Sequence, residues 1–290
     1  MLTEKDLQQI DAQGLTLQQV VSQLETFAKG IPPVSVVTAA SIGNGIMDIS
    51  ESEQKKLIAL YEERKKKKTI VKFVPASGAA TRMFKFLFEF LETFNPEQET
   101  FNRFLKQGNH KQLEKFSKSV RDFPFVNEVR KKIREHYPEY KQSRKGARLR
   151  YFVKSMLDEK GLNFAKLPKG LIPFHKYTKY ATTAFEEQLY EAALYATSKT
   201  DAYLHFTFSE QHVPFFKQEF EAVKNRVEKK TKTEFHISYS FQKPATNTIA
   251  VGPDNKPFRA ANGDLVFRPS GHGALLDNLN EVNADLIFIK

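Results

Sequence analysis

Three short segments of this chain combine small residues with a cation or an imidazole, a combination that suits phosphate binding. The first, GAATRM at residues 78–83, follows the alternating apolar run 70–74 and Pro75 and leads into a helical pattern. The run predicts a short buried strand, which Pro75 ends because it has no amide hydrogen to donate. A small-residue loop before a helix presents bare amides, and the helix dipole favours an anion there. The candidate phosphate-binding residues are Gly78, Ala79, Ala80 and Thr81, with the side chain of Arg82 beside them.

Close packing of a helix against a strand also selects small residues, so this loop alone is equally compatible with a structural role. Its sequence matches neither the G-x-x-x-x-G-K-[ST] pattern nor the G-x-G-x-x-G pattern of known phosphate loops. The loop is therefore a candidate site only in combination with other segments.

The second and third segments lie in the last part of the chain. Lys169 lies in the turn PKG, which would hold its ammonium as a point charge for a phosphate. In RPSGHG, His272 has a glycine on each side (Gly271 and Gly273), which would let a flat ligand approach the backbone closely. Each segment also has a plain interpretation: an exposed loop lysine, and a turn at a helix start whose histidine faces solvent.

The elements around these segments predict an α/β fold. Periodicity and the capping pairs Thr16–Gln19 and Ser50–Glu53 predict helices before residue 68, and the region from 84 to about 160 is helical in pattern. Strand and helix patterns alternate after residue 165, which predicts a sheet with parallel strands and makes the helical region an insertion. The expected strands are 201–209, 234–241, 261–269 and 284–290, and the expected helices are 183–197, 213–229 and 271–283.

Composition excludes several classes of protein. The 290 residues can bury a substantial core, and 26 phenylalanines with no tryptophan indicate that Phe forms much of it. The absence of cysteine excludes disulfides and thiolate metal sites. A polar N-terminus and the lack of an apolar run of about 20 residues predict a cytoplasmic protein with no membrane partner. The chain has no H-E-x-x-H or G-x-S-x-G motif to support a zinc site or a serine hydrolase.

The net charge of +11 lies entirely in residues 103–154, which hold 16 Lys/Arg and 5 Asp/Glu. Phe116, Tyr137, Tyr140 and Tyr151 are interleaved with these cations, as contacts to a nucleic-acid backbone with base stacking would require. Nucleic acid is therefore an alternative partner, although the same aromatics fit helix core spacing and charge runs are usually solvated faces. The basic region would also attract a polyanionic nucleotide substrate.

Taken in order, PASGAATRM after a strand, LPKGLIPFHKY and FRPSGHGALLDNLN resemble the sugar-1-phosphate nucleotidylyltransferases. The GHG turn and the segment SFQKP, with Gln242, are most similar to the UDP-sugar pyrophosphorylase branch. Closer still, the three segments resemble an uncharacterised bacterial family that carries a domain of unknown function. The resemblance covers residues 69–83 and 161–290 and implies a three-layer, Rossmann-like nucleotidyltransferase fold with a mostly parallel sheet. The remaining divisions are an N-terminal helical region at 1–68 and a basic helical insertion at 84–160.

The resemblance also implies a reaction, in which a sugar-1-phosphate oxygen attacks the α-phosphate of a nucleoside triphosphate and pyrophosphate leaves. The amides of residues 78–81 and the side chain of Arg82 would hold the triphosphate, and Lys169 would neutralise phosphate charge in the transition state. Gln242 and the backbone of residues 271–273 would recognise the base. Mg²⁺ is the implied cofactor, bridging the phosphate oxygens.

Two departures from the family's pattern concern this expected chemistry. Ala80 stands where the family usually places a glycine, and its methyl group would hinder close approach of a phosphate. In the resembled enzymes a metal-binding aspartate follows the strand that corresponds to residues 284–290, and Asp264, Asp277 and Asp285 do not occupy that position. We therefore assign no metal ligand and expect the sequence to be a fragment of a longer protein.

Overall fold

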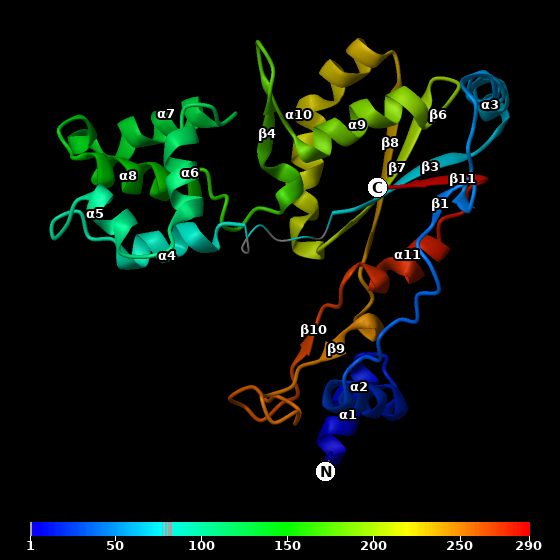
Figure 1. Cartoon of the computed structure of the whole chain (residues 1–290), viewed down its shortest axis with the longest axis horizontal. Helices are drawn as coiled ribbons and strands as arrows, with labels where there is room; N and C mark the ends of the chain where they lie inside the picture. Colours follow the sequence, from blue (N-terminus) through cyan, green and yellow to red (C-terminus); the bar gives the residue numbers. More distant parts are fainter. Residues whose placement is uncertain (1, 77, 79, 81–82) are drawn as a thin grey trace.

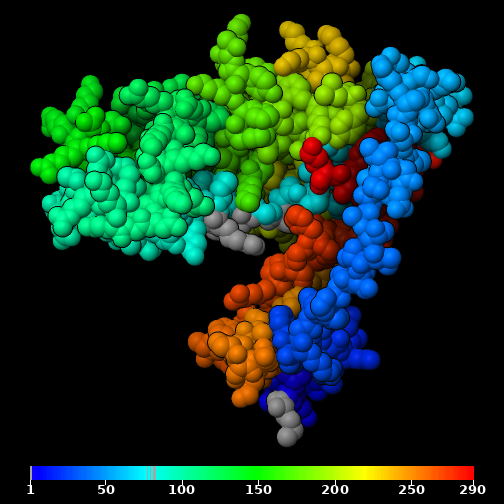
Figure 2. All heavy atoms as spheres, viewed as in Figure 1, coloured from blue at the N-terminus to red at the C-terminus, as the bar shows by residue number. Residues whose placement is uncertain are grey.

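The computed structural model describes residues 2–76, 78, 80 and 83–290. Figure 1 shows three parts: a sheet with flanking helices, a helical lobe beside it, and a smaller lobe that holds the N-terminal helices and a segment from late in the chain. In Figure 2 the blue N-terminal residues and the orange late segment lie side by side in this smaller lobe. Each part has its own cluster of buried apolar side chains. The structure is therefore a mixed α/β protein with three separate cores.

The central sheet is built on four parallel strands in the order β11–β3–β7–β8. Strand β7 is paired on both sides along its length, with Pro75 and Ser240 both in register with Thr207. The short strand β6 adds an antiparallel pair at the start of β7. The bounds are β3 (Ile70–Pro75), β6 (Thr197–Ser198), β7 (Asp201–Phe208), β8 (Glu234–Phe241) and β11 (Leu286–Ile289). The predicted, mostly parallel sheet is confirmed.

The two faces of this sheet differ in cover. Helices α9 (Ala184–Tyr195) and α10 (Val213–Thr231) pack on one face, where Leu204, Phe206 and Phe235 are buried. The other face holds polar side chains and the short helix α11 (Leu276–Asn280), and Tyr203 and Ile289 on it are exposed. The expected three-layer, Rossmann-like arrangement is therefore only partly present, because one face lacks a full helical layer in the described structure.

The helical lobe confirms that phenylalanine forms much of the core. Phe90 packs against Phe94, Phe101 and Phe104 with ring centroids 5.2–6.1 Å apart. Such offset and edge-to-face contacts suit the charge distribution of aromatic rings. The helices of the lobe are α4 (Lys85–Thr93), α5 (Phe101–Lys106), α6 (Lys111–Ser119), α7 (Val126–His136) and α8 (Lys145–Leu157).

The small lobe joins residues from both ends of the sequence. Helices α1 (Glu4–Ala12) and α2 (Leu17–Lys29) each begin with a capping box, at Thr3 and at the expected Thr16. Their apolar face packs against Ile249 and Leu265. The Arg259 guanidinium also donates to both carboxylate oxygens of the buried Asp6, at 2.7 and 2.8 Å. Asp6 and Arg259 are 253 positions apart in the sequence, so the lobe forms only when these two distant segments meet.

The strand predicted at 261–269 is wrong in length and in place. Only β10 (Phe267–Arg268) forms there, and it pairs antiparallel with β9 (Thr248–Ile249) outside the main sheet. The expected turn is present, with Gly263 at φ +84°, but it closes an isolated bridge between Arg259 and Leu265. Alternation of apolar residues here therefore reflects packing on α1 and α2 rather than a place in the sheet.

Several short elements complete the chain. Helix α3 begins after Ser50, whose side chain accepts from the amide of Glu53 as predicted. The remaining elements are β1 (Ser41–Ile42), β2 (Gly45–Ile46), α3 (Glu51–Arg64), β4 (Pro173–Lys176), β5 (Ala181–Thr183), and the 3₁₀ helices η1 (Lys65–Lys67), η2 (Pro138–Lys141), η3 (Lys169–Leu171), η4 (Glu210–His212), η5 (Pro244–Thr246) and η6 (His272–Leu275).

Candidate functional site

The carboxyl ends of β3, β7 and β8 meet at one edge of the sheet, where ligands of open parallel sheets usually bind. Pro75, Thr207 and Ser240 form one row across the three strands at this edge. The amide of Ala76 extends the ladder by donating to the carbonyl of Thr207 at 2.9 Å. The loops that leave the sheet beyond this row are the ones that the sequence singled out.

Two of the three predicted segments are in direct contact. The amide of Lys169 donates a hydrogen bond of 3.1 Å to the carbonyl of Gly78. Leu171, at the end of η3, is buried in the core of the sheet, while the side chain of Lys169 is exposed. Gly170 lies against the ring of Phe216, and a Cβ atom there would come within 3.0 Å of it. The turn is therefore fixed by packing, and it holds an exposed ammonium beside the Gly78 loop.

Part of the predicted phosphate loop lies outside the described residues, namely Ala79, Thr81 and Arg82. Ala80 is described, and it is completely buried in the core of the helical lobe. Its methyl group therefore packs into the protein, and neither that group nor the Ala80 backbone reaches solvent. Gly78 is exposed, and a Cβ atom at that position would meet nothing within 4 Å. Of the described loop residues, Gly78 is the one open to a ligand.

Gln242 lies at the same edge, directly after β8. Its Nε2 atom is buried and has no hydrogen-bond partner among the described residues, and the same is true of Thr207 Oγ1 and Asn278 Oδ1. Asn278 is only 1% exposed, and its Nδ2 donates to Ser240 Oγ and to the carbonyl of Phe241, both at 2.8 Å. Buried polar atoms without partners are rare and costly, so a hydrogen bond from a water or a ligand would stabilise each of them.

The third segment reaches this edge through α11. Gly271, His272 and Gly273 are exposed, and Cβ atoms at the two glycines would meet nothing within 4 Å. The helix that follows is anchored to β8 by Asn278, which fixes the turn near the end of that strand. The open backbone agrees with the expected approach of a flat ligand, although the structure shows no contact between His272 and the described residues of the Gly78 loop.

Two histidines of β7 and its loop are held neutral by burial. The two ring nitrogens of His205 form hydrogen bonds with Ser238 Oγ and Ser240 Oγ, each 2.9 Å long, and the ring stacks on Phe73. Burial lowers the pKa of His205, and it also lowers the pKa of His212, whose Nδ1 has no partner in the described chain. A neutral imidazole can both donate and accept, so β7 and the loop after it offer uncharged polar groups.

Among the described residues, no group of three potential metal ligands lies at this edge. The cluster of potential metal ligands found among them is Asp201, Glu234 and His236, whose ligand atoms lie within 4.8 Å of one another. These residues are at the amino ends of β7 and β8, which is the opposite edge of the sheet. Asp264 pairs with Lys5 in the small lobe and Asp285 pairs with Lys68 before β3, so neither faces the candidate site.

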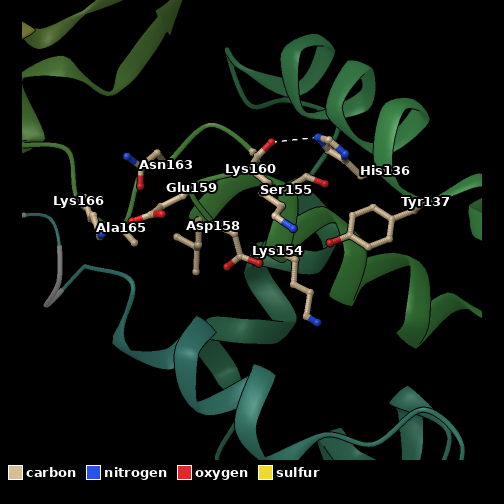
Figure 3. Close-up of a pocket in the computed structure, with 12 residues that line it drawn as sticks. His136, Tyr137, Lys154, Ser155, Asp158, Glu159, Lys160, Asn163, Ala165 and Lys166 are labelled. Atoms are coloured by element: carbon tan, nitrogen blue, oxygen red, sulfur yellow. Dashed lines mark hydrogen bonds and ion pairs between the residues drawn. The ribbon is translucent and has the colours of Figure 1, made fainter.

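Several cavities lie in the helical lobe, and two of them bear on the basic region of the chain. The larger, of about 720 Å³, lies between the ends of α7 and α8 and the loop after α8 (Figure 3). The smaller, of about 300 Å³, lies between α6, α7 and α8, and five cations but no carboxylate line it among the described residues. Those cations are Lys118, Arg121, Arg130, Lys145 and Arg148. The basic region is evident in the sequence, whereas neither cavity leaves a signal there.

Comparison with known proteins gives a family but no named relative. The family model described as "Domain of unknown function (DUF4301)" matches residues 3–290. Neither a curated protein nor a solved structure matches the chain. Within the described residues, no helix is both long and apolar enough to cross a membrane. The match extends through the helical lobe and the small lobe as well as the sheet.

Proposed function

Because this chain belongs to the DUF4301 family, whose description gives no activity, we propose a function from its own residues. The protein binds a nucleoside triphosphate at the carboxyl edge of the sheet and transfers the nucleotidyl group to a sugar-1-phosphate. In this reaction a phosphate oxygen of the sugar-1-phosphate forms a bond to the α-phosphorus, and the bond from that phosphorus to the β-phosphate oxygen breaks. Pyrophosphate leaves with the electron pair of the broken bond.

The observation that carries this proposal is the hydrogen bond between the Lys169 amide and the Gly78 carbonyl. It joins two segments about 90 positions apart and brings the backbone of the exposed Lys169 to a small-residue loop at the end of a parallel strand. Phosphoryl-type transfer depends mainly on positioning and on positive charge around the phosphate oxygens. Lys169 would supply that charge, and we route no step through a metal ion held by this chain.

The unpartnered polar atoms at the same edge would recognise the base. Gln242 Nε2 is a donor and Asn278 Oδ1 is an acceptor, and both lie near the end of β8. A pyrimidine or purine edge offers complementary acceptors and donors in one plane. The exposed glycines at 271 and 273 would leave room for the flat ring.

Binding of UTP tests this proposal directly. We expect UTP with Mg²⁺ to raise the melting temperature of the wild type, and Lys169→Ala to weaken binding about tenfold or more, which corresponds to about 1.4 kcal/mol. Lys176→Ala is the matched control, since Lys176 is an exposed lysine on β4 in the next element of the chain. No shift with any of the four ribonucleoside triphosphates would contradict the proposal. Release of pyrophosphate when a sugar-1-phosphate is added would then establish the reaction.

The basic cavity favours a second candidate function, which is binding of a nucleic-acid backbone. Five cations around about 300 Å³ with no lining carboxylate would suit a phosphate group, and Tyr140 lies on the wall. Such binding would weaken steeply with salt, because each phosphate contact releases counterions. Single-stranded RNA should then bind with a salt slope that falls by about one unit in Arg130→Gln. Absent or salt-insensitive binding would exclude this function.

A further inference from the structure

The large cavity of the helical lobe has the form of a preformed pocket. His136 and Tyr137 contribute from the end of α7, and Lys154 and Ser155 contribute from the last turns of α8. The loop at 158–166 closes the remaining side, and Figure 3 shows the labelled side chains of these segments around one shared space. Its volume of about 720 Å³ lies within the range of about 300–1,000 Å³ of small-molecule sites.

The loop that closes the cavity is held tightly against α8. The amide of Leu162 donates to the carbonyl of Ser155 at 2.9 Å, and a Cβ atom on Gly161 would come within 2.1 Å of that same oxygen. Asn163 adopts a positive φ of 55°, and its amide donates to the carbonyl of Asp158 at 3.1 Å. Only glycine fits at 161, so the shape of the loop is fixed before any ligand binds.

Two residues of the cavity wall each have a buried side-chain oxygen without a hydrogen-bond partner among the described residues. Ser155 is only 3% exposed, yet its Oγ has no hydrogen-bond partner among the described residues. Asn163 Oδ1 is also buried and also lacks a partner among them. Each such atom destabilises the free protein unless a ligand or water satisfies it. Ser155 interrupts the apolar face of α8 at a core position, where a small apolar residue would pack without this cost. The hydroxyl is therefore a candidate contact for a ligand that enters the cavity.

The charges of the wall suit a ligand with an anionic group and hydroxyl groups. Lys154 and Lys160 line the cavity and make no ion pair within the described residues, whereas Lys166 pairs with Glu159. The carboxylate of Asp158 also lines the cavity without an ion pair to a described residue. Carboxylate and amide oxygens accept from hydroxyls, and the ring of Tyr137, stacked on Tyr151 at 4.5 Å, presents an aromatic wall.

We propose that this cavity binds a phosphorylated sugar and is the acceptor subsite of the protein. Lys154 and Lys160 bind the phosphate, and Asp158, Ser155 and Asn163 bind the hydroxyls. This assignment rests on the proposed function, because the nucleotidyl acceptor there is a sugar-1-phosphate.

The path of the chain connects this subsite with the candidate nucleotide site. Ala165 and Lys166 line the cavity, and Lys169, which contacts Gly78, follows three residues later. Three residues span at most about 11 Å even when fully extended. One short stretch of chain therefore has its first part in the wall of the cavity and its end at the Gly78 loop.

Calorimetric titration with glucose 1-phosphate tests the subsite, both alone and with saturating UTP and Mg²⁺. We expect wild type to bind glucose 1-phosphate at least tenfold more tightly than glucose or inorganic phosphate. Lys160→Gln should weaken binding about tenfold, and Lys131→Gln, which removes an exposed charge from α7 outside the cavity, should not. Ser155→Ala should also weaken binding while leaving the melting temperature of the free protein unchanged or raised, because it removes an unsatisfied hydroxyl.

Three results would overturn the subsite. They are no binding of glucose 1-phosphate in either condition, equal binding of glucose or inorganic phosphate, and wild-type binding by both Lys160→Gln and Ser155→Ala. The UTP measurements with Lys169→Ala are made without a sugar phosphate, so they test the proposed nucleotide site separately. A normal UTP response with no sugar-phosphate binding would therefore remove the subsite alone, and the reverse result would remove the nucleotide site alone.

Discussion

Lys72 and Glu191 form an ion pair across the boundary between the central strand β3 and helix α9. The Lys72 Nζ atom lies 2.9 Å from Glu191 Oε2 and 3.2 Å from the carbonyl of Gln188, and the Lys72 side chain is completely buried. Burial lowers the pKa of Lys72, and the carboxylate of Glu191 partly offsets that effect. The strand predicted around this lysine is therefore apolar except for one cation, which α9 must neutralise.

Glu191→Ala should destabilise the protein, because it leaves the buried ammonium of Lys72 without its carboxylate. We expect the free energy of unfolding to fall by about 2 kcal/mol, less than the 3–5 kcal/mol of fully buried pairs, since Glu191 is partly exposed. Lys72→Met should lower the free energy of unfolding by less than Glu191→Ala does. Urea denaturation at pH 7 gives the free energy of unfolding of the wild type and of both variants.

The same pair predicts a pH dependence with a definite sign. A lysine whose pKa is lower in the folded state makes folding less favourable when it is protonated, so stability rises as the pH increases toward 10.5. The deficit of Glu191→Ala relative to wild type should therefore shrink between pH 7 and pH 10. A deficit that stays constant over that range would show that Lys72 does not titrate in the variant.

Acid should release the small lobe before the rest of the protein unfolds. Hydrogen bonds from the Arg259 side chain hold the pKa of the buried Asp6 carboxyl far below its usual value of 3.8. A carboxyl with a lowered folded pKa adds stability above that value and loses it as the pH falls further. We expect near-neutral samples to keep the lobe and samples below about pH 3.8 to lose it progressively, seen as faster hydrogen exchange in α1 and α2. Asp6→Asn should show fast exchange at every pH.

Gly146→Ala should destabilise the helical lobe although alanine is the better helix former. Gly146 is the second residue of α8, where the exchange would add less than the roughly 1 kcal/mol of stability that it gives in a helix interior. A Cβ atom there would come within 2.4 Å of the buried ring of Phe94, and overpacking of this kind costs about 1–3 kcal/mol. We expect a net loss of about 1 kcal/mol by thermal denaturation. A gain in stability would show that the Phe94 ring can move aside.

Thr207→Val should stabilise the free protein by about 1 kcal/mol, because it removes a buried hydroxyl without a described partner while keeping the shape of the side chain. The measurement is the urea midpoint without nucleotide, with Thr182→Val as a control, since the Thr182 hydroxyl bonds to Glu187. The control should lose stability. Equal losses in both variants would mean that the Thr207 hydroxyl is satisfied in the free protein.

Regular, strongly patterned elements of this fold could be predicted from the sequence. The expected strand 234–241 coincides with β8, and the expected 201–209 and 70–74 each differ from β7 and β3 by one residue. These strands are buried on at least one face, so their apolar pattern is set by the sheet itself. The strand expected at 261–269 failed because its apolar residues pack on helices from the other end of the chain. Such packing leaves no local signal.

The candidate sites were predictable only in part. Glycines and lysines in turns marked the Gly78 and Lys169 segments, but their hydrogen bond depends on how the helical lobe returns the chain to the sheet. Asn278 was missed because its role depends on the docking of α11 onto β8. Ser155 is visible in the sequence as a polar residue at a core position of a helical pattern. The cavity beside it is not, because it also depends on Gly161 packing against the Ser155 carbonyl.

The small lobe also sets an order of events during synthesis. The Gln23 side chain accepts from the amide of Ile249, 226 positions later, so α2 emerges from a ribosome long before its partners exist. At about 5–20 residues per second the delay is roughly 10–45 s. During that time α2, at 13 residues, is a marginal helix whose apolar face is open to solvent or to a chaperone. Helix α2, although it is made long before its partners, is therefore among the last parts of this protein to fold.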